Sequence, residues 1–83
     1  MDKTLQDLYG YACDYLNGKV DDGEDVVQFG AEVFETYGKN LPNDDIEFAC
    51  ENCHKYVNGE NDGDYTIDEL VEDLTAWLGN YFV

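Results

Sequence analysis

The sequence predicts an all-α fold, a compact four-helix domain built from two helix-loop-helix hairpins that spans residues 1–83. Apolar residues recur every three or four positions in four separate stretches, which is the spacing of one helix face. An Asn-Gly pair follows the first and the third stretch and suits the left-handed end of a helix. Hydrophobic residues make up 43% of the chain, which is enough for one modest core. A hairpin buries its own apolar face poorly, so we expect the two hairpins to pack together.

The first predicted helix covers residues 3–17 and ends at Asn17-Gly18. The second covers residues 24–37 and ends at Gly38. It follows an acidic run at 21–25, and carboxylates are favourable at a helix start because of the helix dipole. The expected inward residues of these two helices are Leu5, Leu8, Tyr9, Ala12, Leu16, Val26, Val27, Gly30, Val33, Phe34 and Tyr37.

The third predicted helix covers residues 43–57, with Pro42 at its start and Asn58-Gly59 at its end. The fourth covers residues 66–81, and Thr66 with Glu69 forms a capping box at its start. The expected inward residues of these two helices are Ile46, Ala49, Cys50, Cys53, Val57, Ile67, Leu70, Val71, Leu74, Trp77, Leu78 and Tyr81.

The two predicted hairpins resemble each other at an offset of 41 residues. The segment Tyr15–Gly18 aligns with Tyr56–Gly59. At the same offset the stripe of the first helix aligns with that of the third, and Val26 aligns with Ile67. Either an internal duplication or convergent patterning of two hairpins accounts for this match.

The chain is strongly acidic, with twenty Asp and Glu against four Lys and no Arg, so its formal net charge is -16. Solubility alone calls for a charge of only about 2–8 units on a small domain. Direct nucleic-acid binding and anionic membranes are disfavoured, because phosphates are bound by clustered Lys and Arg. The N-terminal residues show neither a signal peptide nor a membrane span, so we expect a cytoplasmic protein. Its partner should carry positive charge: a basic protein surface or a metal ion.

The twelve residues 58–69 resemble the calcium-binding loop of the EF-hand family. Gly63 stands at the sixth position and Glu69 at the twelfth, where the family has its turn glycine and its bidentate ligand. The resemblance implies a metal site formed by Asn58, Glu60, Asp62, Asp64 and Glu69. Asn58 departs from the usual Asp, and the corresponding first loop lacks the pattern. A solvated acidic turn into a capped helix explains the same residues.

Three cysteines and one histidine raise the question of a second metal. Cys50, Cys53 and His54 match the literal pattern of c-type haem attachment, but the expected cytoplasmic location and the lack of a second axial ligand disfavour haem. Zinc would need Cys13 as a fourth ligand. Because Cys50 and Cys53 fall on the predicted core stripe, we expect them to be small core residues. Calcium thus stays open, zinc is disfavoured and no other cofactor is expected.

No arrangement in the sequence is typical of an enzyme, because His54 is the only imidazole and there is no Arg or glycine-rich phosphate loop. Binding is the better hypothesis. Acidic residues cluster at 21–25, 44–47, 60–64 and 68–73. The aromatic residues off the core stripes nearby are Tyr11, Tyr15, Phe48 and Tyr65, which as exposed rings would help to anchor a partner. The candidate partner-binding residues are Asp21, Asp22, Glu24, Asp25, Asp44, Asp45, Glu47, Tyr11 and Tyr15.

In size, charge and helicity the chain resembles the small acidic inhibitors of phages and mobile elements. These include DNA mimics, anti-CRISPR proteins and anti-restriction proteins. Carboxylates spaced along rigid helices can imitate the phosphates of a nucleic acid. The resemblance implies stoichiometric inhibition of a basic nucleic-acid-binding protein, such as a CRISPR effector, restriction enzyme or nuclease, by a monomer or a small homo-oligomer.

Overall fold

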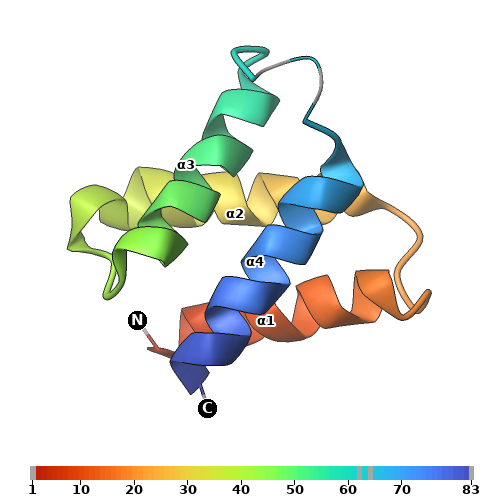
Figure 1. The fold of residues 1–83 in the computed structure, drawn as a ribbon, viewed down its shortest axis with the longest axis horizontal. Helices are drawn as coiled ribbons and strands as arrows, with labels where there is room; N and C mark the ends of the chain where they lie inside the picture. The colour runs from red at the N-terminus through yellow and green to blue at the C-terminus, as the bar shows by residue number, and fades with distance from the viewer. Residues whose placement is uncertain (1, 62, 64, 83) are drawn as a thin grey trace.

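Four α-helices and one short 3-10 turn make up the fold in a computed structural model, which describes residues 2–61, 63 and 65–82 (Figure 1). The helices are α1 (Asp2–Leu16), α2 (Gly23–Tyr37), α3 (Asp44–Val57) and α4 (Ile67–Phe82), and the 3-10 turn is η1 (Gly38–Asn40). This arrangement confirms the predicted all-α, four-helix domain, and each predicted boundary lies within one residue of the observed one.

The two hairpins form two layers that cross each other. In Figure 1 the α1–α2 hairpin lies behind and the α3–α4 hairpin lies in front of it. Helix α2 packs mainly on α3, and α1 packs mainly on α4, so each helix of one hairpin is covered by the other hairpin. The predicted mutual burial of the two hairpins is therefore confirmed.

The core lies between the layers and is wholly apolar. It contains Leu5, Leu8, Ala12, Val26, Val27, Ala31, Val33, Leu41, Ile46, Ala49, Cys50, Cys53, Leu70, Val71, Leu74 and Leu78. No described polar or charged residue is buried. The prediction of an inward position is wrong for two residues, because Leu16 and Val57 are each 42% exposed. Both stand in the last turn of a helix, beyond the point where the crossing helix covers it.

Helices α1 and α3 end in the same way. Gly18 and Gly59 have φ angles of 78° and 73°, and each follows the Asn that was expected to stop the helix. The amide after each glycine returns to a carbonyl five residues earlier, from Lys19 to Asp14 and from Glu60 to Lys55, both at 2.8 Å. This is a Schellman motif, so the predicted left-handed ends are confirmed.

Side chains cap the starts of α2, α3 and α4. Asp22 accepts a hydrogen bond from the Glu24 amide, and Asn43 accepts from the amides of Asp45 and Ile46. Pro42 therefore precedes the cap of α3 instead of opening the helix, because the side-chain acceptor of Asn43 is what stops the chain there. Thr66 Oγ1 accepts from the Glu69 amide at 3.2 Å, as the capping box requires.

The structure corrects the repeat in its second half. The offset of 41 holds from α1 to α3, where Leu5 and Ile46 are both buried. From α2 to α4 the buried positions match at an offset of 44, so that Val27 corresponds to Val71 and not to Asp68. The reason is loop length, because residues 17–22 join the first hairpin and the longer segment 58–66 joins the second.

Candidate protein-binding surface

The acidic residues that the structure describes lie at the surface, and few of them form an ion pair. No described carboxylate is buried. Within the described ranges the ion pairs are Lys3–Asp7, Lys55–Glu51 and His54–Glu35, with nitrogen–oxygen distances of 3.9, 3.6 and 3.3 Å. All three involve exposed or half-exposed groups, which contribute little to stability. The negative field of the molecule is therefore available to a partner.

The first predicted acidic run lies at the start of α2. Asp21, Asp22, Glu24 and Asp25 are all exposed, and Asp22 accepts the Glu24 amide at 2.9 Å. Glu24 and Asp25 stand in the first helical turn, where the helix dipole stabilises their charge. These four residues form what we call the α2-start cluster.

Tyr11 and Tyr15 of α1 lie beside the α2-start cluster, with which they were grouped as candidate partner-binding residues. The Tyr11 ring packs against Phe29 with ring centroids 6.4 Å apart. Partial burial, followed by the charges of Asp25 and Asp22, raises the pKa of Tyr11. However, both tyrosines are half-buried and pack on the core. They were expected off the core stripes as exposed anchors, and that expectation is wrong because α2 and α4 cover their rings.

Asp68 of α4 joins this cluster, which the sequence alone did not indicate. The Tyr15 hydroxyl donates to Asp68 Oδ1 at 2.7 Å, and this bond is the main reason that the pKa of Tyr15 is raised. The starts of α2 and α4 meet here. A Cβ added to Gly23 would lie 2.6 Å from Ile67 Cγ2 and 2.8 Å from the Tyr15 ring. The feature of the sequence that comes nearest to indicating this contact is the small residue Gly23 between acidic neighbours.

The second predicted run lies elsewhere. Asp44, Asp45 and Glu47 stand in the first turn of α3, which follows the far end of α2. The 15 residues of α2 span about 22 Å, so the structure does not bring the two runs together. Asp44 and Asp45 are exposed and Glu47 is half-buried. We call these three residues the α3-start cluster, a separate candidate surface.

The loop expected to bind calcium is described in part. Asp62 and Asp64 lie outside the described residues. Asn58 ends α3 and its amide contacts the His54 ring at 3.2 Å, while Glu60 is exposed. The Glu69 carboxylate accepts from the Thr66 hydroxyl at 3.3 Å. The described part of the chain contains no group of three or more His, Cys, Asp or Glu side chains that could hold a metal ion.

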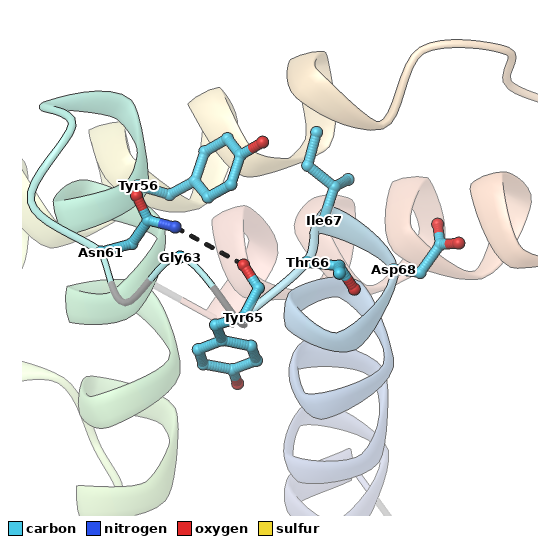
Figure 2. Close-up of a pocket in the computed structure, with 7 residues that line it drawn as sticks. All are labelled: Tyr56, Asn61, Gly63, Tyr65, Thr66, Ile67 and Asp68. Atoms are coloured by element: carbon cyan, nitrogen blue, oxygen red, sulfur yellow. Dashed lines mark hydrogen bonds between the residues drawn. The ribbon is translucent and has the colours of Figure 1, made fainter.

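A pocket of about 440 Å³ lies at this loop (Figure 2). The Asn61 side-chain amide donates to the Tyr65 carbonyl at 3.5 Å across it, while the Tyr65 ring points away from Tyr56 and Ile67. Burial raises the pKa of Tyr65, and the hydrogen bond that its hydroxyl donates to Asp73 raises it further. The residues that line the pocket are Tyr56, Asn61, Gly63, Tyr65, Thr66, Ile67 and Asp68.

Cys50 and Cys53 occupy the core positions that the sequence predicts for them. Cys50 and Cys53 are fully buried, and Cys13 is half-buried. Burial raises the pKa of Cys50 to about 12 and raises that of Cys53 further. A thiolate ligand for zinc would need the opposite shift.

Phe48 is the most exposed of the large hydrophobic residues that the structure describes, at 55%. It was expected off the core stripe and lies there. Its ring meets Trp77 edge-on, with centroids 6.0 Å apart. Trp77 was expected inward, but it is only half-buried, and the Phe48 ring packs against it at the surface.

Comparison with protein-family models, with curated proteins and with solved structures finds no match to this chain. Among the described residues no helix has the length and apolar character to cross a membrane. The candidate surface is therefore assigned from its own chemistry: carboxylates at the starts of three helices and aromatic rings beside them.

Proposed function

We propose that this protein is a stoichiometric inhibitor that binds a basic nucleic-acid-binding protein and occupies its nucleic-acid groove. One observation supports the proposal most. The chain has a net charge of -16, no described acidic side chain is buried, and few of the described ones have a cationic neighbour. A groove built from Lys and Arg to hold phosphates attracts such a surface.

The fold holds these charges on rigid positions. The α2-start cluster and the α3-start cluster are separated by about the length of α2, some 22 Å. Double-stranded DNA carries one charge per about 1.7 Å, so a groove built for it is lined with cationic groups along its length and could contact two acidic clusters that lie apart. Binding through such charges is fast and weakens with salt.

The test is displacement of nucleic acid. Labelled duplex DNA is bound to a panel of basic proteins, namely a CRISPR effector, a restriction enzyme and a nuclease, and the protein is titrated in. We expect release of the DNA from a susceptible target at one equivalent, and loss of that effect as salt approaches 1 M. A complex that survives molar salt contradicts the proposal, because exposed charge pairs are screened there.

Two sets of Asp→Asn and Glu→Gln variants locate the charges that matter. One set neutralises the α2-start cluster, and the other neutralises the α3-start cluster. Asn at position 22 keeps the acceptor that caps α2, so the fold is preserved. Glu32→Gln with Glu72→Gln, both exposed and outside the clusters, serves as the control for charge alone.

Calcium binding by residues 58–69 is the alternative. The observation that favours it is the position of the loop between two antiparallel helices, with α4 beginning inside the twelve-residue segment. A calcium titration of chelator-treated protein tests it by the amide NMR signal of Gly63. Saturation at micromolar calcium, lost in Glu69→Gln, supports the alternative. Weak, scattered shifts at millimolar calcium contradict it.

A further inference from the structure

The aromatic pair Phe48–Trp77 lies where α3 and α4 run antiparallel in the front layer (Figure 1). Phe48 is 55% exposed although its ring touches Trp77 at 6.0 Å between centroids. An exposed aromatic ring of this kind loses favourable burial unless a partner covers it.

The repeat of the two hairpins shows which residue type the fold accepts at the place of Phe48. Position 48 of α3 corresponds to position 7 of α1 at the offset of 41 that the buried residues confirm. Position 7 is an aspartate, exposed and paired with Lys3 at 3.9 Å. The same place in the other hairpin thus accepts a charged residue in a well-formed helix. A helix in this place of a hairpin therefore does not need a phenylalanine in order to form.

Carboxylates surround the exposed ring. Asp45 and Asp44 lie three and four residues before Phe48, which places them on the same helix face. Both are exposed, and neither forms an ion pair with the described part of the chain. Glu51, three residues after Phe48, pairs with Lys55. Free negative charge therefore borders an aromatic surface at the start of α3.

We propose that Phe48 and Trp77, with Asp44 and Asp45, form the anchor that receives an arginine side chain of the basic partner. A guanidinium stacks on an aromatic ring while its N–H groups donate to carboxylates, and a lysine ammonium does this less well. The inference rests on the proposed function and names the surface and the residue type that it recognises.

Charge complementarity selects this occupant. A second copy of the chain would bring another net charge of -16 and a second acidic rim to the same surface. Phosphate backbones and anionic lipids are repelled for the same reason. A cationic planar group satisfies both the ring and the carboxylates.

Trp77 is the only tryptophan, so its fluorescence reports binding at this surface directly. The probes are nona-arginine and nona-lysine peptides, titrated at low and at physiological ionic strength, with amide NMR to map the contact. We expect nona-arginine to bind severalfold more tightly and to change Trp77 fluorescence. Phe48→Ala should weaken nona-arginine binding about tenfold and remove the preference over nona-lysine.

The control variant is Leu16→Ala, which truncates an exposed apolar residue at 42% exposure far from α3 in the sequence. It should bind both peptides like the unchanged chain. Asp44→Asn with Asp45→Asn should also reduce the arginine preference. Glu32→Gln with Glu72→Gln removes the same charge and should weaken both peptides equally. Circular dichroism checks that every variant folds.

Three results would overturn the inference. If both peptides bind and Phe48→Ala leaves their affinities unchanged, the anchor is elsewhere, while the proposed function stands. If neither peptide binds at low ionic strength, the anchor and the proposed function fail together. If sedimentation shows a dimer that Phe48→Ala dissociates, the surface serves a second copy of the chain.

Discussion

At the scale of single residues, Gly30 determines how closely α2 and α3 approach. A Cβ at this position would lie 2.8 Å from Cys53 Sγ and 3.1 Å from Cys53 Cβ. Gly30 is buried and Cys53 is fully buried, so the Cys53 side chain cannot move into solvent to make room. The absence of a side chain at position 30 is a packing requirement of the crossing layers.

Gly30→Ala should therefore destabilise the protein, by about 1–3 kcal/mol, because overpacking of the interface outweighs the better helix propensity of alanine. Gly10→Ala is the matched control, since nothing lies within 4 Å of a Cβ there. It should stabilise α1 by about 0.5–1 kcal/mol. Urea unfolding of both variants measures the difference, and equal stabilities would contradict the close approach.

The buried thiols make stability depend on alkaline pH. The pKa of Cys50 is raised by burial from 9.0 to about 12, and the pKa of Cys53 is raised by burial and by Cys50. The folded chain keeps both thiols protonated at a pH where the unfolded chain releases the protons. Their contribution to stability is complete below pH 9 and is lost as the pH rises toward the folded pKa.

Between pH 9 and 10 the free energy of unfolding should fall by about 1 kcal/mol for each buried thiol. The tyrosines whose pKa is raised in the folded chain, such as Tyr15 and Tyr65, add to the fall near pH 10, because the ordinary tyrosine pKa is 10.0. Urea unfolding at the two pH values measures it. Cys50→Ala with Cys53→Ala should flatten the slope even if it lowers stability, and an unchanged slope would show that other groups cause it.

At the scale of the helices, caps fix where each element begins. The Asn43 side chain accepts the Asp45 amide at 2.7 Å and the Ile46 amide at 3.4 Å. The first turn of α3 carries the α3-start cluster, so the cap also positions the charges proposed to meet the partner.

Asn43→Ala should cost about 1 kcal/mol of stability, because two amides at the start of α3 lose their acceptor. Asn43→Asp keeps an acceptor and should cost much less. Thermal unfolding followed by circular dichroism compares the two variants. A loss of similar size in both would assign the effect to the amide group of Asn43 instead of to the cap.

At the scale of the whole molecule, repulsion among the unpaired carboxylates opposes the folded state. The net charge is -16 on 83 residues, and the folded chain concentrates that charge on a small surface. The apolar core and the caps must offset this repulsion. Salt screens it, with a Debye length that falls from about 30 Å at 0.01 M to about 3 Å at 1 M.

The melting temperature should therefore rise with ionic strength, by several degrees between 10 mM and 500 mM salt for about 1 kcal/mol of relieved repulsion. Sodium chloride and choline chloride should act alike, with a chelator present, because the effect is screening and not site binding. A flat melting temperature, or a rise with sodium chloride alone, would contradict this explanation.

Much of the fold follows from local patterns in the sequence. Apolar spacing predicts four helices, and Asn-Gly pairs and Thr66 predict their ends, because capping and helix periodicity depend on neighbours within one or two turns. The acidic runs can also be read from the sequence, because their members are neighbours along the chain. Leu16 and Val57 are misplaced, since exposure at a helix end depends on where the crossing helix stops.

The sequence by itself determined the helices, the Asn-Gly ends of α1 and α3, the capping box of α4, the net charge and the burial of Cys50 and Cys53. Only the tertiary structure decided which charges share a surface. It brought Asp68 to Tyr15, separated the α3-start cluster from the α2-start cluster, and left Phe48 exposed beside Trp77. The physical reason is that helix formation is local, whereas the juxtaposition of surface groups depends on how two hairpins cross and on loops of unequal length.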